Sequence, residues 1–301
     1  MPRARTIPAL LPIALLLAAG TARAQAPVLV HAASVYEDEK NQPLKEPEGV
    51  ACGEGGKLVV ADTGNGRLLR LTYLNGVVSG GTALQLPQLP YPVRVQIDAQ
   101  GGLWVLDRKV RRIGRVDPSG AFSGYLEVKG GASPDAVVPG AFRLDRNGGV
   151  VLLDMAAARV LVLDSTGAVQ RQLELPKRPA FFTDLALDPA GTVYAVDAAG
   201  GALWSAARSA TSFTLLAKGL KDSMSFPGYL TVSRGRLFLV DQNGDGLVVL
   251  GLDGSYQGRQ LGIGWSDGLV YYPAQLCIDE AGSAFLADRY NNRVQIFSMR
   301  K

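Results

Sequence analysis

Histidine is almost absent from this sequence, since His31 is the only one among 301 residues. Zinc sites built from several histidines, and catalytic triads with histidine as the base, both need this side chain in a defined place. His31 falls in a segment that is interpreted below as a structural strand. The sequence therefore excludes histidine-based zinc and triad chemistry, and any catalysis would have to use carboxylates.

Long apolar runs are equally scarce. The one candidate, residues 9–19, is far shorter than the roughly 20 residues that cross a bilayer. Two arginines precede it, and the small residues Ala22 and Ala24 follow it, which is the pattern of a secretory signal peptide. We expect residues 1–24 to be removed after Ala24. The mature chain, residues 25–301, would then act in the periplasm or outside the cell, with no membrane span.

The excess of positive charge is small as well. The formal net charge of +4 includes three arginines and no acids of the predicted signal peptide, which leaves 4 − 3 = +1 for the mature chain. Nucleic-acid binding depends on a clustered positive surface, so we expect no nucleic-acid partner. The remaining 301 − 24 = 277 residues are enough to bury a large core in a single domain without the help of disulfides.

What the sequence does contain is an internal repeat. Apolar runs that end in aspartate, such as LVVAD and LWVLD, recur at spacings of 45, 47, 43, 44 and 47 residues. Each copy also has an upstream proline, a tight turn before the apolar run and a third apolar strand after the aspartate. A period of about 40 to 50 residues is typical of propeller blades, and such turns join antiparallel strands. The repeat predicts six blades, centred on Asp62, Asp107, Asp154, Asp197, Asp241 and Asp288.

The last copy ends with its third strand and lacks an outer one. Residues 28–36 precede the first copy, have the composition of a strand and belong to no other blade. Pairing this segment with the last copy would remove an open sheet edge. We therefore predict an all-β fold, a six-bladed β-propeller of four-stranded antiparallel blades, whose ring is closed when the N-terminal strand pairs with the last blade.

Two stretches carry a more specific resemblance. VADTGNGRL at 60–68 and LADRYNNRV at 286–294 resemble NHL repeats, and Tyr272 and Pro273 follow the family's order upstream of the last copy. The fourth and fifth copies keep neither the asparagine nor the arginine of this signature. The resemblance implies one propeller domain that serves as a rigid platform for protein contacts, or for RNA in some relatives. Some related six-bladed propellers are lactonases or lyases.

An arginine follows the repeat aspartate by five residues in four copies. Both partners recur with the repeat, which favours a structural ion pair across a turn over a ligand site. The predicted structural pairs are Asp62 with Arg67, Asp107 with Arg112, Asp154 with Arg159, and Asp288 with Arg293.

Two metal sites stand as alternatives to the expectation that the chain has no catalytic residue and no cofactor. Asp241, Asn243 and Asp245 alternate as in a calcium loop, but the twelfth position holds leucine where an EF-hand has glutamate. The resemblance to lactonase-type propellers implies a divalent metal on the ring axis. Glu48, at the start of an inner strand, would then hold the metal and Asp184 would face it across the ring.

The two cysteines, Cys52 and Cys277, fall at matching positions in the inner strands of the first and last copies. An exported protein can form a disulfide, and a closed ring makes these strands neighbours. Facing strands can still hold the Cα atoms beyond the 7 Å limit for a disulfide. We expect two buried thiols, with a disulfide as the alternative.

For recognition, we select two loops. One contains Trp265, Tyr271 and Tyr272, and the other is the basic turn with Lys109 and Arg111. Aromatic and arginine side chains often dominate the energy of protein interfaces. The sequence thus favours an exported, non-catalytic scaffold that binds another exported protein, or a glycan. A metal-dependent lactonase or hydrolase is the alternative, and the sequence does not indicate an oligomeric state.

Overall fold

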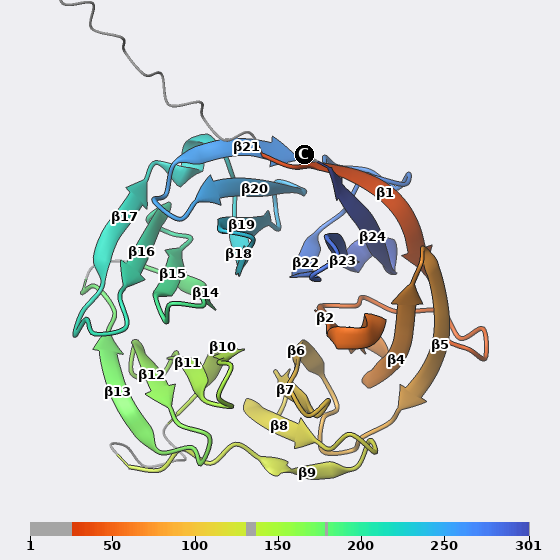
Figure 1. Cartoon of the computed structure of the whole chain (residues 1–301), viewed down its shortest axis with the longest axis horizontal. Helices are drawn as coiled ribbons and strands as arrows, with labels where there is room; N and C mark the ends of the chain where they lie inside the picture. Colours follow the sequence, from red (N-terminus) through yellow and green to blue (C-terminus); the bar gives the residue numbers. More distant parts are fainter. Residues whose placement is uncertain (1–25, 131–136, 178–179, 301) are drawn as a thin grey trace, which may run out of the picture.

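Six four-stranded antiparallel sheets stand around a central axis, as the propeller prediction requires (Figure 1). The computed structural model describes residues 26–130, 137–177 and 180–300, so the predicted signal peptide lies outside the described residues. Among the residues described, no helix is long and apolar enough to cross a membrane.

Each blade begins with the strand nearest the axis and ends at the rim of the ring. Blades 1 to 3 consist of β2 (Gly49–Cys52), β3 (Lys57–Asp62), β4 (Arg67–Leu74) and β5 (Val77–Leu84); β6 (Pro92–Ile97), β7 (Leu103–Asp107), β8 (Arg112–Val116) and β9 (Phe122–Tyr125); and β10 (Pro139–Leu144), β11 (Val150–Asp154), β12 (Arg159–Leu163) and β13 (Val169–Glu174). Blades 4 to 6 consist of β14 (Phe182–Leu187), β15 (Val193–Asp197), β16 (Ala202–Ala206) and β17 (Thr214–Lys218); β18 (Pro227–Ser233), β19 (Arg236–Asp241), β20 (Gly246–Gly251) and β21 (Tyr256–Gln260); and β22 (Pro273–Ile278), β23 (Ser283–Asp288), β24 (Arg293–Arg300) and β1 (Val28–Val35).

The N-terminal strand closes the ring, which confirms the prediction. Strand β1 pairs antiparallel with β24, from Val28 opposite Arg300 to Val35 opposite Val294. It thereby supplies the fourth strand of blade 6 and covers the edge that the last repeat leaves open. In Figure 1 the red N-terminal strand lies against the dark blue C-terminal one.

A disulfide closes the ring a second time, and here the expectation of two buried thiols was wrong. Cys52 on β2 and Cys277 on β22 are bonded, and their Cα atoms are 5.8 Å apart. This separation is within the range that a disulfide spans. The physical reason is that both strands are the innermost of their blades, where neighbouring sheets converge on the axis.

The apolar core lies between the blades. Six clusters of buried side chains each combine residues of two neighbouring blades, such as Val60 of blade 1 with Phe285 of blade 6. The middle strands are buried on both faces, and Leu106 and Val196 are among their inaccessible side chains. This arrangement explains why these strands are apolar throughout instead of alternating with polar residues.

The six repeat aspartates are almost fully buried, and each has the same task. Its carboxylate accepts a backbone N–H from the loop that leads into its own blade. The donors are Lys45, Tyr91, Val138, Phe181, Ser225 with Phe226, and Tyr271, in blade order. Each aspartate thus fixes the entry to the inner strand, which is the reason that the repeat keeps it.

The turn after each aspartate ends in a residue with left-handed backbone conformation. This residue always lies four positions after the aspartate, with φ between 49° and 62°, and the six are Gly66, Arg111, Ala158, Gly201, Asp245 and Asn292. Glycine and asparagine adopt this conformation at low cost, whereas other residues are strained there.

Three of the four predicted Asp and Arg pairs are present. Arginine Nε lies 2.6 to 2.9 Å from the aspartate carboxylate in the pairs Asp62 with Arg67, Asp154 with Arg159, and Asp288 with Arg293. Asp107 and Arg112 do not pair, because Asp107 accepts three backbone N–H groups and the Arg112 guanidinium lies 4.2 Å from the centre of the Tyr125 ring.

In blade 5 the repeat aspartate also pairs with an arginine, but the arginine comes from a different strand. Its aspartate, Asp241, pairs at 2.8 Å with Arg259 of the outer strand β21. Gly246 stands where blades 1, 2, 3 and 6 have arginine, and a Cβ there would come within 2.7 Å of the Arg259 guanidinium. The glycine therefore makes room for an arginine that arrives from elsewhere in the blade.

Candidate functional site

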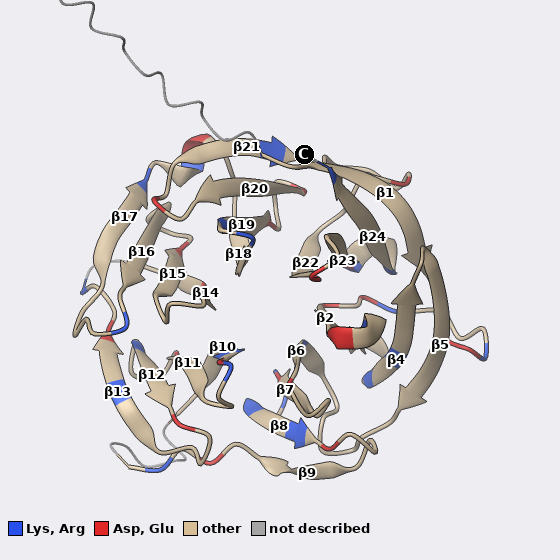
Figure 2. Cartoon of the chain, viewed as in Figure 1, with Lys and Arg blue, Asp and Glu red and all other residues tan. Residues whose placement is uncertain are grey.

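The inner strands carry charged residues at the ring axis. Figure 2 shows one of the basic positions on β10, close to the centre of the ring. Arg143 of this strand donates to Asp184 Oδ2 of blade 4 at 2.7 Å and to the carbonyl of Phe142. Burial acts to lower the pKa of Arg143, but the charge and hydrogen bond of Asp184 together with Tyr229 outweigh it, and the pKa is raised.

Two further side chains cross between blades at the axis. Arg94 of blade 2 donates to the carbonyl of Gly228 in blade 5 at 2.9 Å, and its guanidinium lies over the ring of Tyr229. Gln275 of blade 6 bonds both backbone groups of Val95, at 3.2 and 2.8 Å. The centre of the ring is thus tied together by polar side chains.

Glu48 lies at the mouth of the axis and is bound by arginines. Arg108 of blade 2 donates two hydrogen bonds of 3.0 and 2.7 Å to its carboxylate, and Nη2 of Arg289 in blade 6 lies 3.4 Å from Glu48 Oε1. Asp184 pairs with Arg143 of blade 3 and accepts the N–H of Leu230. Both carboxylates of the lactonase alternative are therefore neutralised by arginine, and this donor set does not fit a divalent metal on the axis.

From Glu48 a continuous arc of aromatic and arginine side chains runs over the adjoining loops. Arg289 lies 5.0 Å from the centre of the Tyr290 ring, which stacks on Tyr272 at 4.7 Å. Tyr290 also contacts Tyr271, which in turn contacts Trp265. On the other side, Arg108 lies over the ring of Tyr91. The aromatic–arginine arc is defined by Trp265, Tyr271, Tyr272, Tyr290, Arg289, Glu48, Arg108 and Tyr91.

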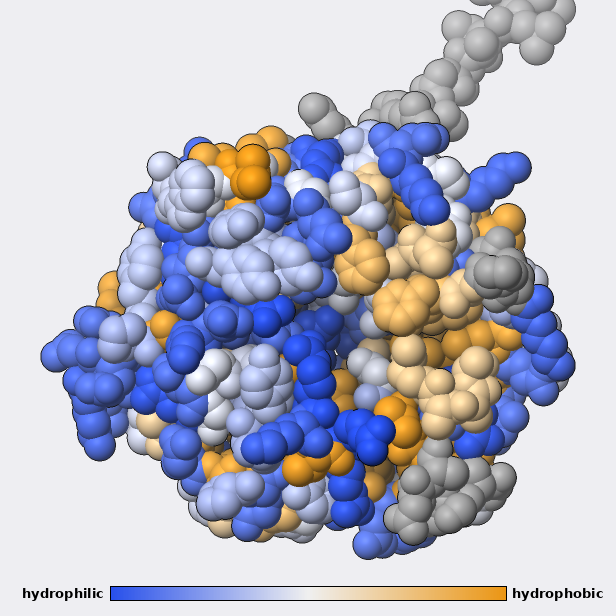
Figure 3. Space-filling model, turned by 180° about the vertical axis from the view of Figure 1, so that it is seen from behind, coloured by the Kyte–Doolittle hydropathy of each residue, from blue (hydrophilic) through white to orange (hydrophobic). Residues whose placement is uncertain are grey.

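The arc lies on one face of the ring, here called the loop face. This face carries the turns after the repeat aspartates and the loops into the inner strands. Figure 3 shows the ring from behind, with a hydrophilic hollow at its centre. Trp265 is the most exposed large hydrophobic residue described, at 76%. The arc therefore combines a rigid charged base with an exposed aromatic end.

Trp265, Tyr271 and Tyr272 lie in one loop, and Tyr290 of the turn after Asp288 contacts the two tyrosines. Lys109 and Arg111 lie apart from these aromatics, in the exposed turn of blade 2 next to Arg108. Sequence reasoning missed Arg108, Arg289, Tyr290 and Tyr91. A signal was present, because Arg108 and Arg289 each follow directly after a repeat aspartate, in the two blades that flank Glu48.

The loop with Asp241, Asn243 and Asp245 has its carboxylates committed elsewhere. Asp241 binds Arg259 and the N–H groups of the preceding loop, while Asp245 accepts the N–H of Tyr272. Burial raises the pKa of Asp245. A guanidinium thus occupies the side of the loop that an ion would approach, and the described residues contain no cluster of three or more His, Cys, Asp or Glu side chains that would hold a metal.

Comparisons with known proteins establish the fold. A virginiamycin B lyase from Staphylococcus aureus is 15% identical with a TM-score of 0.63, over 88% of this chain and 98% of that one. A gluconolactonase from Xanthomonas campestris is 19% identical with a TM-score of 0.66, over 92% and 95%. A chain of a nidogen–laminin complex is 16% identical with a TM-score of 0.58, over 78% and 92%. No family model and no curated protein matches the sequence.

This chain is a six-bladed β-propeller. The solved structures support that architecture, and because their sequence identities to this chain are below 20%, they show its fold alone. The NHL resemblance stays a prediction, since no family model supports it.

Proposed function

We propose that this propeller is an exported, non-catalytic binding protein that holds another exported protein on its loop face. The observation that carries the proposal is the aromatic–arginine arc. It joins an exposed tryptophan, four tyrosines and two arginines, which Glu48 links, in one contact chain. Tryptophan, tyrosine and arginine are the residues that most often carry binding energy in protein interfaces.

The base of the arc is preorganised, which favours binding. Arg108 and Arg289 are held by Glu48, and Arg289 also contacts Glu46 at 2.9 Å. Tyr272 stacks on Tyr290, so neither ring has to be ordered when a partner arrives. A surface whose side chains are already fixed loses less conformational entropy on binding than a flexible one.

The basic turn beside the arc indicates the charge of the partner. Arg108, Lys109 and Arg111 lie within four residues, and only Arg108 among them has an acidic partner in the part of the chain that the structure describes. A complementary surface would carry acidic groups opposite this turn and an apolar pocket for Trp265. Charges at an interface rim mainly raise the association rate and fix the orientation.

Photo-crosslinking tests this function. The full chain is expressed in its native host with benzoylphenylalanine in place of Trp265, and as a matched control in place of Val77, which is exposed at the outer edge of blade 1. We expect a discrete protein adduct from position 265 alone. With the partner identified, Trp265→Ala should weaken binding by about 2 kcal/mol or more, about thirtyfold in Kd. Equal adducts from both positions, or none from 265, would refute the proposal.

Export is tested separately. Cleavage after Ala24 would give a mature protein that begins at Gln25, and N-terminal sequencing of the purified protein reports this directly. A protein that retains residues 1–24 and stays inside the cell would contradict the predicted export without affecting the loop-face proposal.

A metal-dependent hydrolase is the second candidate, because two of the solved structures similar to this chain are described as gluconolactonases. In this chain Glu48 and Asp184 are paired with arginines. A hydrolase would show stoichiometric divalent metal after purification and lactone hydrolysis that Glu48→Gln abolishes. A binding protein should show neither the metal nor the activity.

A further inference from the structure

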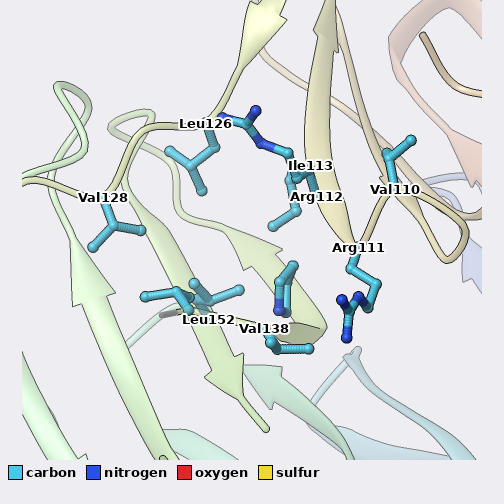
Figure 4. A pocket seen from close by; sticks show the side chains of 10 residues that line it. Val110, Arg111, Arg112, Ile113, Leu126, Val128, Val138 and Leu152 are labelled. Atoms are coloured by element: carbon cyan, nitrogen blue, oxygen red, sulfur yellow. The ribbon is translucent and has the colours of Figure 1, made fainter. Parts of the chain in front are cut away.

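A cleft of about 200 Å³ opens between blades 2 and 3, beside the turn of blade 2 that carries Arg108. Its wall combines polar and apolar surface: Arg111 and Arg112 line it together with the apolar side chains of Val110, Ile113, Leu126, Val128, Val138 and Leu152. Figure 4 shows Arg111 and Arg112 on opposite sides of this group, with Arg112 extending past Leu126.

The cleft lies at the turn of blade 2, whose arginine does not pair with the repeat aspartate. In blades 1, 3 and 6 the equivalent arginine turns inward and pairs with its aspartate. In blade 2 Arg112 is exposed and lies over Tyr125 instead. Asp107 does without it because three backbone N–H groups satisfy its carboxylate. The Arg112 guanidinium therefore lies at the rim of the cleft and not beside Asp107.

Within the described ranges, both arginines at the cleft lack an acidic partner. Neither Arg111 nor Arg112 takes part in an ion pair between described residues. Arg111 also holds the left-handed conformation at φ 55°, where blades 1 and 4 have glycine. The conformation recurs at this position in all six blades, so it belongs to the turn, and in blade 2 the turn places the Arg111 side chain at the cleft. The cleft therefore joins an apolar interior to an unneutralised positive rim.

We propose that this cleft binds a small monocarboxylate with an apolar body, with the carboxylate on Arg111. An apolar cavity of about 150 Å³ takes a benzene-sized ligand, so a cleft of about 200 Å³ has room for one ring and a short arm. The ring would lie among Ile113, Leu126 and Leu152. The arm would bring the carboxylate out to the arginine, where a charge-assisted hydrogen bond forms.

Calorimetric titration of the full mature chain tests the site, with 3-phenylpropionate as the probe and 3-phenylpropanol as its neutral counterpart. We expect the carboxylate to bind more tightly than the alcohol. Arg111→Gln should weaken binding of the carboxylate about tenfold and leave binding of the alcohol unchanged. Because glutamine has a Cβ as arginine does, this variant keeps the same backbone strain and isolates the charge.

Two further variants make the result specific. Leu126→Phe narrows the apolar space and should abolish binding of both probes, while Arg234→Gln, a change at an exposed arginine in a distant turn of blade 5, should alter neither. Equal affinity for acid and alcohol, no effect of Arg111→Gln, or no binding of either probe would overturn the proposal. None of these results depends on the partner protein proposed for the loop face.

Discussion

The disulfide between Cys52 and Cys277 makes a quantitative prediction. It joins residues 225 positions apart, and thus ties blade 1 to blade 6 across nearly the whole described chain. The relation between loop length and chain entropy gives about 5 kcal/mol of stabilisation for such a loop at 25 °C. The physical reason is that the bond restricts the unfolded chain, while the folded ring is held closed by β1 and β24 in any case. We therefore expect the reduced protein to fold, but with much lower stability.

The assay is urea unfolding of the oxidised wild type, the reduced wild type and the double variant Cys52→Ser with Cys277→Ser. The reduced protein and the double variant should lose about 5 kcal/mol relative to the oxidised protein. Their m-values should be larger, because an unfolded chain without the crosslink exposes more surface. Fluorescence and circular dichroism followed together would show whether unfolding is two-state, as this comparison requires.

A difference below about 1 kcal/mol between oxidised and reduced protein would refute the reasoning, because chain entropy alone predicts several times more. An unchanged m-value with a large loss of stability would also count against it. That result would place the effect in the folded ring and not in the unfolded chain.

Four further outcomes follow from the fold. Ala158→Gly should raise stability by about 1 kcal/mol in urea unfolding, because glycine relieves the left-handed strain at φ 49°; an unchanged midpoint would contradict this. Asp245→Asn should raise the thermal midpoint at pH 7, since burial raises the pKa of this carboxyl and so makes its charged form unfavourable. The charged carboxyl destabilises the folded protein above its folded pKa and has no such effect below the unfolded pKa of about 3.9, so the rise in thermal midpoint should vanish near pH 3.5. If the loop bound calcium, Asp245→Asn would instead lower the thermal midpoint. Val196→Asp should leave no folded protein in circular dichroism, because it buries a charge between blades. Deletion of residues 27–36 should cause aggregation in light scattering by exposing β24, and a monodisperse product would contradict the closure argument.

The sequence alone was sufficient for the architecture. The aspartate, the turn after it and the next strand recur at fixed spacings, so the strands of each blade can be predicted from that copy of the repeat alone. The missing outer strand of the last copy and the unassigned strand at residues 28–36 also fit together by elimination. Local spacing therefore determined the number of blades, their strand order and the closure by β1.

The tertiary structure alone decided which distant side chains meet. Arg289, Glu48 and Arg108 are far apart in sequence, and they join because blade 6 closes against blade 1 and both flank the same axial mouth. In blade 5, Arg259 of the outer strand pairs with the repeat aspartate, because the usual arginine position holds a glycine. In blade 2, Arg112 lies over Tyr125 and does not pair with Asp107. The disulfide likewise depends on a Cα separation of 5.8 Å that spacing along the chain does not determine. A repeat fixes backbone positions, but the direction and partner of each long side chain depend on what the neighbouring blade places beside it.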